Sequence, residues 1–264
     1  MSLIRGGLIF FFTIVLFFSV FLCATFIIIS FSLEYNNIKT ELNPVLKEFK
    51  NGKLNLLEEN FNLTREVNNN RDLMKKKCVN ETSYVFSSGG YVFTLPCSLI
   101  EKNVTEEEFL DLGIESIIHD IYYKNYECDF LDCFNKKNPF FIISEKSKKY
   151  FWDKSKIAFI ISLFIVFILF FLTKKKQNAI IILGSILIIS ALFIILIKKI
   201  FNFIFSGINF QLFSIFFSQS YWVVVTLLIL GIIFIIFGIS LKISITNLSK
   251  KKFLNKLLHK STQK

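Results

Sequence analysis

The stretch GGLIFFFTIVLFFSVFLCATFIIISFSL, residues Gly6–Leu33, contains no charged side chain. Three further uncharged runs follow later in the chain, at Ile157–Thr173, Gln177–Ile197 and Ile200–Leu241. A run of roughly 18 or more apolar residues is long enough to cross the hydrocarbon core of a bilayer as a helix. The sequence therefore predicts an integral membrane protein.

The acidic residues divide the chain into two kinds of sequence. All 20 Asp and Glu residues lie between Glu34 and Asp153, whereas the flanking segments carry only Lys and Arg among their charged side chains. A polar domain is thus predicted at 34–155, between the first apolar run and the others. With 264 residues, the chain has room for one such domain and for no second one.

The basic residues beside the apolar runs predict the side of the membrane that each loop occupies. Arg5 precedes the first run, Lys174–Lys176 separate the second and third, and a lysine-rich tail follows the last. Because basic loops stay in the cytoplasm, these clusters favour cytoplasmic termini and an outer position for 34–155 at the cell membrane. Lys198 and Lys199 oppose this layout, since it leaves them at the outer face.

The number of crossings depends on the segment Ile200–Ser220. It is uncharged, but polar side chains interrupt it, and Asn202, Ser206 and Asn209 share one helical face. We interpret it as an interfacial or re-entrant helix, because a fifth span would move the lysine-rich tail outside. The prediction is four spans, with five as the alternative.

The predicted fold is a membrane all-α bundle of four transmembrane helices, with an α+β extracytoplasmic domain inserted between helices 1 and 2. The first helix is expected to stay as an anchor because its apolar run is too long for a signal peptide. Cys23 within it is expected to be a buried thiol. The parts are the anchor at 1–33, the outer domain at 34–155, helices 2–4 with the segment 200–220 at 156–241, and a basic cytoplasmic tail at 242–264.

Local patterns predict the structure of the outer domain. Tyr35–Lys77 is rich in Glu, Lys, Asn and Leu and predicts two or three helices, with Pro44 and Gly52 as interruptions. Aromatic and β-branched residues flank Ser87–Gly90 and predict a hairpin. Thr105 opens a capping box that predicts a helix through about Tyr123.

The four cysteines of this domain, Cys78, Cys97, Cys128 and Cys133, predict two disulfides, because disulfides persist outside the cytoplasm. Three pairings are possible and the sequence does not choose among them. Cys78–Cys97 would tie the ends of the hairpin, and Cys128–Cys133 would close a tight loop. The alternative is a four-thiolate zinc site, which the spacing disfavours because Cys78 and Cys97 form no short pair. No metal or cofactor is predicted.

Two surface features predict contacts with glycans and lipids. Asn-X-Thr sequons make Asn62, Asn80 and Asn103 candidates for glycosylation. The tail predicts a basic amphipathic helix lying on lipid headgroups. Its contact residues would be Lys250, Lys251, Lys252 and Lys256. Membrane lipids thus account for the net charge of +11, and no nucleic acid is expected as a partner.

A weak catalytic candidate is His119, which adjoins Asp120 and lies four residues after Glu115 on the predicted helix. A general-base pair of His119 and Glu115 is conceivable, but the helical pattern places both on the face opposite the apolar stripe. We interpret His119 as a surface residue, because a catalytic histidine needs a concave site. The predicted buried stripe is Leu110, Ile114, Ile117, Ile118 and Ile121.

The apolar runs contain no Asp, Glu or His. Membrane proteins that transfer protons or cleave peptides within the bilayer keep such residues there despite their cost. The sequence therefore disfavours a proton-coupled transporter, a rhodopsin-like pump and an intramembrane aspartyl protease.

The order of one span, a large disulfide-bearing domain and three closely spaced spans resembles that of claudin-type tetraspan proteins. It also resembles the layout of bacterial lipoprotein intramolecular transacylases. The Trp motif in the first loop of claudins is missing here. The activity of the transacylases would imply an outer histidine near the last two spans; Phe203–Ser220 contains none, and only His119 could replace it.

Three short motifs resemble those of uncharacterised archaeal membrane proteins. They are LIRGG at Leu3–Gly7, SLEY at Ser32–Tyr35, and a Cys128…Cys133 pair followed by SEK at Ser144–Lys146. The resemblance extends through the second span. It implies a location in the cell membrane and no particular activity.

These features predict a non-enzymatic binding or assembly component that acts through its outer domain on a partner protein or as a homo-oligomer. One alternative is a lipid- or acyl-handling membrane enzyme at the outer interface, with His119 as the base. The other is an oligomeric pore subunit, which the polar residues Asn202, Asn209 and Gln211 would favour.

Overall fold

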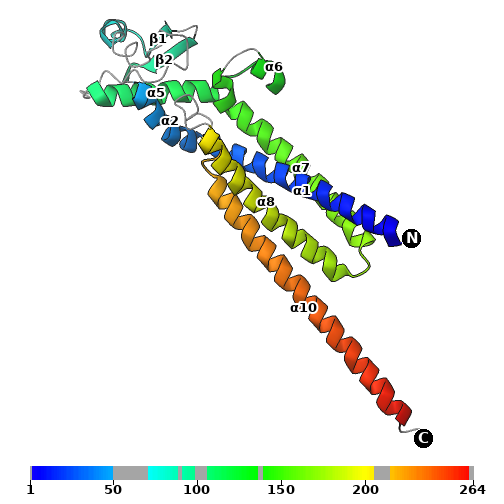
Figure 1. The fold of residues 1–264 in the computed structure, drawn as a ribbon. Helices are drawn as coiled ribbons and strands as arrows, with labels where there is room; N and C mark the ends of the chain where they lie inside the picture. The colour runs from blue at the N-terminus through cyan, green and yellow to red at the C-terminus, as the bar shows by residue number, and fades with distance from the viewer. Residues whose placement is uncertain are drawn as a thin grey trace. The chain divides into compact units, whose positions relative to one another are not determined.

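The computed structural model describes most of the chain (Figure 1). The described ranges are 2–49, 71–88, 91–98, 106–135, 139–204 and 215–261. The chain forms two compact units. The first, here called the helical unit, comprises Met1–Phe26, Lys154–Ile197 and Tyr221–Lys264; the second, the domain unit, comprises Ile27–Asp153 and Lys198–Ser220.

Four helices are long and apolar enough to cross a membrane, which confirms the predicted number of candidate spans within the described ranges. They are α1 (Ser2–Ser32), α7 (Glu145–Leu172), α8 (Lys176–Ile204) and α10 (Ser220–Ser261). Their apolar parts are Ile4–Ser32, Glu145–Leu172, Lys176–Ile200 and Ser220–Ile245. Residues 205–214, the middle of the candidate segment Ile200–Ser220, lie outside the described residues, so its interfacial or re-entrant position stays a prediction.

Within the helical unit, polar groups connect α1 to α7. The hydroxyls of Ser19 and Ser162 lie 2.8 Å apart, and both contact the Ala158 carbonyl oxygen. Cys23 is a free, buried thiol, as predicted from its apolar surroundings in the sequence. Its sulfur lies 3.5 Å from the Ser155 carbonyl oxygen. Arg5 Nε donates to the Leu172 carbonyl at 2.5 Å. This carbonyl lies at the C-terminal end of α7, where a cation is stabilised by the helix dipole.

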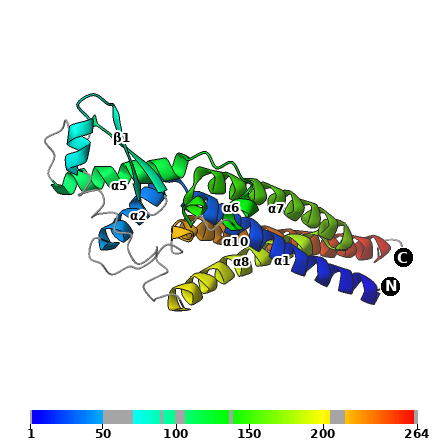
Figure 2. The same cartoon turned by 90° about the horizontal axis from the view of Figure 1, so that it is seen from above.

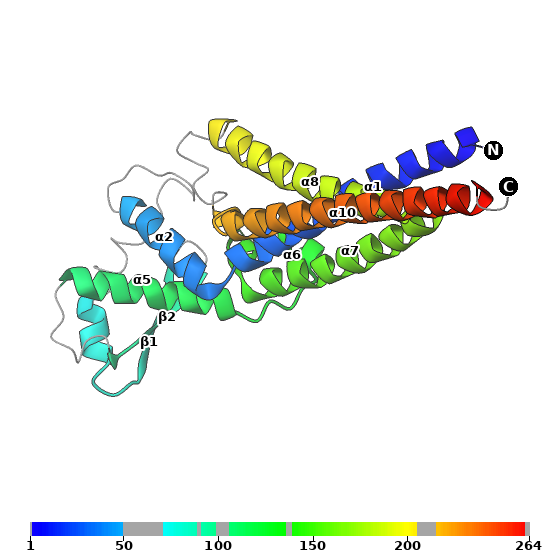
Figure 3. The ribbon, with the colours of Figure 1, turned by 90° about the horizontal axis from the view of Figure 1, so that it is seen from below.

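Glycines bring α8 and α10 close together, and Figure 3 shows these helices converging toward the N-terminal end of α8 and diverging toward its C-terminal end. A Cβ added at Gly184 would meet the Gly231 carbonyl oxygen at 2.7 Å, and one added at Gly231 would meet the Gly184 oxygen at 2.9 Å. Gly238 repeats the arrangement against Ile181. Small residues at such contacts let helix backbones approach closely, which favours association in an apolar solvent.

The domain unit combines helices with a small antiparallel sheet. Its elements before α7 are α2 (Tyr35–Phe49), β1 (Ser83–Ser88), β2 (Tyr91–Pro96), α5 (Glu106–Tyr123), α6 (Phe130–Asn135) and η1 (Pro139–Ile143). A further helix occupies 71–77. Strands β1 and β2 pair from Ser83↔Pro96 to Ser88↔Tyr91, which confirms the predicted hairpin. Figure 2 shows the hairpin beside α5.

The core of the domain unit forms around α5. Ile114, Ile117 and Ile118 are buried as the helical pattern predicts, together with Phe109 and Tyr122. Ile121 is only half-buried, and the side chain of Leu110 lies outside the described residues. Other members of this core come from distant parts of the chain: Leu33, Ile38, Met74, Leu95 and Ile215.

Two disulfides join Cys78 to Cys97 and Cys128 to Cys133. The structure thus selects one of the three possible pairings, and it leaves no free thiolate in this unit for the zinc site considered above. Cys78 follows the helix at 71–77 and Cys97 follows β2, so the first bridge fastens this helix to the hairpin.

Two helices continue where the sequence suggests an interruption. Helix α2 runs through Pro44. A proline removes one hydrogen bond from a helix, but it can bend the helix without ending it. The basic tail is the C-terminal part of α10, which continues to Ser261 as one helix. The side chains of Lys250, Lys251, Lys252 and Lys256 lie outside the described residues, so their contact with headgroups stays a prediction.

Candidate functional site

The chain turns sharply between α1 and α2, at Leu33 and Glu34. The Glu34 amide donates to the Phe31 carbonyl at 3.1 Å, and the Glu34 carbonyl accepts from the Ile38 amide at 2.9 Å, starting α2. Leu33 is fully buried in the core of the domain unit. The turn therefore ends one helix and begins the next within two residues.

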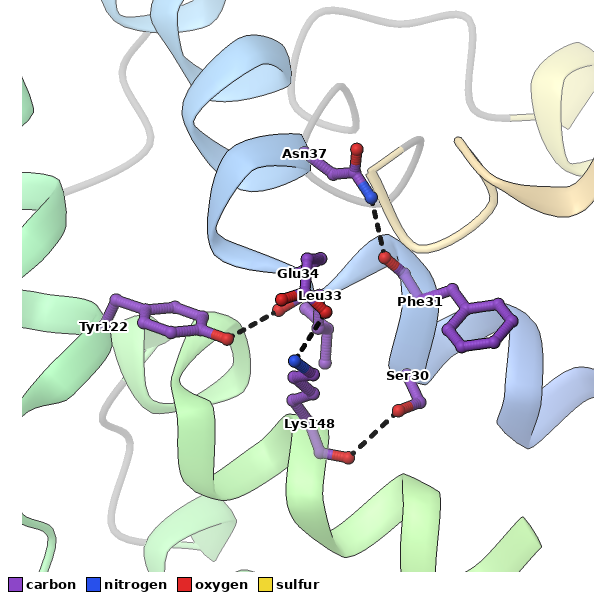
Figure 4. Close-up of polar contacts among 7 residues, drawn as sticks. All are labelled: Ser30, Phe31, Leu33, Glu34, Asn37, Tyr122 and Lys148. Carbon is purple, nitrogen blue, oxygen red and sulfur yellow. Dashed lines mark hydrogen bonds and ion pairs between the residues drawn. The ribbon is translucent and has the colours of Figure 1, made fainter.

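Side chains from four helices, α1, α2, α5 and α7, meet at this turn and form what we call the junction cluster (Figure 4). Its members are Ser30, Phe31, Leu33, Glu34, Asn37, Tyr122 and Lys148. The Tyr122 hydroxyl donates to the Leu33 carbonyl at 3.0 Å, and the Asn37 amide donates to the Phe31 carbonyl at 2.8 Å. These two carbonyls gain side-chain partners where the helix ends, because the last carbonyls of a helix lack intrahelical partners.

An ion pair adds a second connection to α7. Lys148 Nζ lies 2.5 Å from Glu34 Oε2, and the Lys148 carbonyl accepts from the Ser30 hydroxyl at 3.3 Å. Both partners are partly exposed, so solvent screens the charge interaction and the pair contributes little free energy. Its effect is positional: α1, α2 and the start of α7 are held in one arrangement.

Burial raises the pKa of Tyr122 above the ordinary value of 10.0, and the nearby Glu34, Glu145 and Tyr123 raise it further. The side chain is almost wholly buried. At neutral pH Tyr122 therefore remains a protonated hydrogen-bond donor to the Leu33 carbonyl.

Lys198, which opposes the positive-inside pattern, has polar partners near the start of α10. Its Nζ donates to the Phe217 carbonyl at 3.2 Å and to the Ser220 hydroxyl at 3.0 Å. The adjacent Gln219 donates from its backbone amide to the Ser32 hydroxyl at 3.2 Å and from its side chain to the Asn37 oxygen at 3.1 Å. The Phe217 carbonyl and the Ser220 hydroxyl thus give the Lys198 ammonium group hydrogen-bond acceptors within the domain unit.

Beside the junction cluster lies a group of rings that we call the aromatic surface: the exposed His119 and Tyr123 and the half-buried Tyr35. The Tyr35 ring centroid lies 5.8 Å from that of His119 and 5.6 Å from that of Tyr123, and the last two are 4.7 Å apart. The side chain of His119 is 58% exposed, and Tyr123 is 48% exposed. The buried Tyr122 ring supports the group from within, 5.4 Å from Tyr35.

An ion pair between Lys39 and Glu115 adjoins this surface. Lys39 lies one turn after Tyr35 on α2, and Glu115 lies one turn before His119 on α5, so each pair shares a helix face. Burial and the Glu115 carboxylate raise the pKa of Tyr35, while Lys39 opposes the rise. The aromatic surface is thus bordered by one positive and one negative side chain, Lys39 and Glu115.

The carboxylates near His119 have other partners. Glu115 pairs with Lys39, and Asp120 Oδ2 accepts from the Thr94 amide at 3.1 Å. His119 Nδ1 and Asp120 Oδ1 are 3.9 Å apart, which is too far for a hydrogen bond. The His119 imidazole therefore makes no hydrogen bond to Asp120 in this geometry. The exposed side chain of His119 agrees with the surface location that the helical pattern predicts.

Of the three glycosylation candidates, the structure describes Asn80. Asn80 is exposed just after the Cys78 bridge, in a position that a glycan could reach. Asn62 and Asn103 lie outside the described residues. Glycosylation at all three stays a prediction.

The sequence interpretation missed Tyr35, Lys39 and Tyr123 as members of a site. A signal was present on α5, where Glu115, His119 and Tyr123 recur every four residues and therefore share one face. No comparable signal identified Tyr35, because its approach to α5 depends on the turn at Leu33–Glu34.

No protein-family model matches this chain, and neither curated protein sequences nor solved structures match it. An assignment of function therefore rests on the geometry of the junction cluster and the aromatic surface.

Proposed function

We propose that this chain is a non-enzymatic assembly component of the cell membrane that binds a partner protein through the aromatic surface of its domain unit. The observation that carries the proposal is the packing of the exposed His119 and Tyr123 rings on each other and on the half-buried Tyr35. Tyrosines are enriched among residues that dominate protein interfaces, because they bury a large area and lose little conformational freedom.

The support beneath the rings favours this use. Tyr122 packs against Tyr35 and Tyr123 while its hydroxyl is held at the turn after α1. A surface whose side chains are already ordered loses less entropy on binding than a flexible one. The adjacent Lys39–Glu115 pair supplies charge at the rim, where it favours specificity and orientation.

The distribution of basic residues supports an outer position for 34–155 and cytoplasmic termini. An amine reagent that cannot cross membranes would test this layout on intact cells. Lys76, exposed in the domain unit, should react, whereas Lys175 between α7 and α8 should react only after the cells are opened. Labelling of Lys175 in intact cells would reverse the layout.

The binding proposal is tested by native mass spectrometry of the protein extracted gently from its own membrane. The wild-type chain is compared with a His119→Ala/Tyr123→Ala variant. We expect a stoichiometric partner on the wild type and a loss of affinity of about 30-fold or more in the variant, the size expected when interface anchors are truncated.

Leu73→Ala is the matched control, because it removes an exposed large apolar side chain from another helix of the same unit. It should retain the partner. Retention by the double variant, or a wild-type chain with no partner, would contradict the proposal. A homo-oligomer that the double variant dissociates would assign the surface to a second copy of this chain.

A further inference from the structure

The disulfide between Cys128 and Cys133 closes a short loop that continues through α6, and we call residues 128–135 the α6 loop. One side of the loop is firmly packed. The Phe130 ring stacks on Tyr150 with centroids 4.0 Å apart and planes 4° from parallel, and it meets Phe151 edge-on at 5.3 Å. Cys133 is buried with Phe141 in a small separate core.

A lysine on α7 fixes the entry to the loop. Lys146 Nζ donates to the carbonyl oxygens of Tyr126 and Cys128, at 2.6 Å each. Tyr150, Phe151 and Lys146 all belong to the first turns of α7. The α6 loop is therefore held against one level of α7.

Two large apolar side chains of the loop are nevertheless exposed, and one of them, Phe134, also stacks on Phe130 with ring centroids 6.4 Å apart. Leu131 is 65% exposed and Phe134 is 55% exposed. They are three residues apart on a helix and so project from the same face. Because Phe130 and the disulfide hold the backbone, these two side chains cannot turn inward without breaking the packing beneath them.

The position along α7 at which the α6 loop is held indicates that its exposed side chains contact lipid. Tyr150 precedes Ile157, the first residue of the uncharged run of α7, by about 10 Å along the helix axis. Trp152, partly exposed and 6.0 Å from the Phe31 ring, lies between them. Tryptophan is enriched at the boundary between lipid headgroups and acyl chains. From Ile157 onward the exposed residues of α7 are large and apolar, as on a lipid-facing helix.

We propose that the α6 loop is a membrane-interface anchor whose Leu131 and Phe134 insert into the headgroup and acyl-chain boundary of the leaflet that borders the domain unit. Insertion removes both side chains from water. Asp129 precedes them in the sequence, Asp132 lies between them, and both are exposed. The attraction therefore comes from apolar contact and suits a zwitterionic lipid surface. The loop would thereby hold the domain unit at a fixed level on the bilayer.

The test uses the full chain reconstituted into phosphatidylcholine vesicles, with tryptophan as the reporter. Phe134→Trp is a conservative exchange at the apolar face, and Val79→Trp is the control because Val79 is exposed elsewhere in the domain unit. The tryptophan fluorescence of the wild type is subtracted from that of each variant, which leaves the emission of the added tryptophan. This difference is measured in ordinary lipid and in lipid brominated near the headgroup end of the acyl chain.

We expect the added emission of Phe134→Trp to be shifted to the blue and quenched by the brominated lipid. That of Val79→Trp should stay red-shifted and unquenched. Leu131→Trp provides a second reporter on the same face and should behave like Phe134→Trp. If the reporters at positions 131 and 134 are as red-shifted and unquenched as the control, the loop lies in water and the proposal is wrong. A blue shift without quenching would mean burial against protein, and it would also overturn the lipid assignment.

Discussion

The two units of this chain distribute polar and apolar residues in opposite ways. In the domain unit, Ile117, Ile118 and Leu95 are buried, and charged pairs such as Lys148–Glu34 lie at the surface. In the helical unit, serines such as Ser19 and Ser162 are buried, while many phenylalanines and isoleucines face outward. A domain in water is stabilised by removing apolar area from the solvent, whereas helices in lipid depend on close packing and interhelical hydrogen bonds. The comparison predicts that different kinds of substitution weaken each unit.

The largest effect should follow from opening the Cys78–Cys97 bridge in the domain unit. Its cysteines are 19 residues apart, against 5 for Cys128–Cys133. Because a longer loop loses more entropy on closure, removing the first bridge should cost about 3 kcal/mol and removing the second about 2 kcal/mol. Each pair is replaced by alanines, and the free energy of unfolding is measured in detergent with denaturant. Equal losses would show that loop length does not govern the stability of this unit.

In the helical unit the corresponding weak point is the contact between α8 and α10. Gly184→Ala places a Cβ 2.7 Å from the Gly231 carbonyl oxygen, so the backbones must separate. Overpacking of this kind costs about 1–3 kcal/mol. The measurement is the detergent concentration at which the helices dissociate.

Gly6→Ala is the control for that substitution, because a Cβ there meets nothing within 4 Å. It changes the same residue type on another membrane-spanning candidate. If Gly6→Ala and Gly184→Ala are equally stable, close backbone approach does not hold α8 to α10.

In both units the sequence predicted local structure better than contacts between distant residues. The apolar runs, the hairpin and α5 follow from local patterns, and the hairpin and α5 lie close to their predicted bounds. Helix α7 begins at Glu145, before its apolar run, and α10 extends from Ser220 to Ser261, beyond its run. The Gly184–Gly231 contact and the bond from Tyr122 to Leu33 join residues far apart in the chain, and no local pattern encodes such meetings. Pro44 illustrates another limit: a helix that packs on a core can continue through a residue that disfavours it.

The junction cluster offers a pH-dependent comparison. The pKa of Tyr122 is raised in the folded protein above the ordinary value of 10.0, so folding favours the protonated phenol. Its contribution to stability is fully present below pH 10.0 and is lost as the pH rises from there toward the folded pKa, because the unfolded state then binds fewer protons. The free energy of unfolding of the domain unit should fall in that range.

Tyr122→Phe separates this titration from others, such as that of Tyr35. At neutral pH it should cost about 1–3 kcal/mol, because the buried Leu33 carbonyl loses its donor. Its alkaline decline should be shallower than that of the wild type when unfolding is measured at several pH values. Parallel declines would show that Tyr122 does not report the junction.

The smallest effect should come from Ser19→Ala in the helical unit. The variant removes the contacts of the Ser19 hydroxyl with the Ser162 hydroxyl and the Ala158 carbonyl of α7. Ser162 keeps the Ala158 carbonyl as a partner at 2.8 Å, so its buried hydroxyl stays paired. Interhelical bonds of this kind average about 0.6 kcal/mol. Thr226→Ala is the control, since the exposed Thr226 hydroxyl bonds only within its own helix, to the Trp222 carbonyl. A loss for Ser19→Ala as large as that for Gly184→Ala would mean that side-chain hydrogen bonds hold α1 to α7 as strongly as close backbone approach holds α8 to α10.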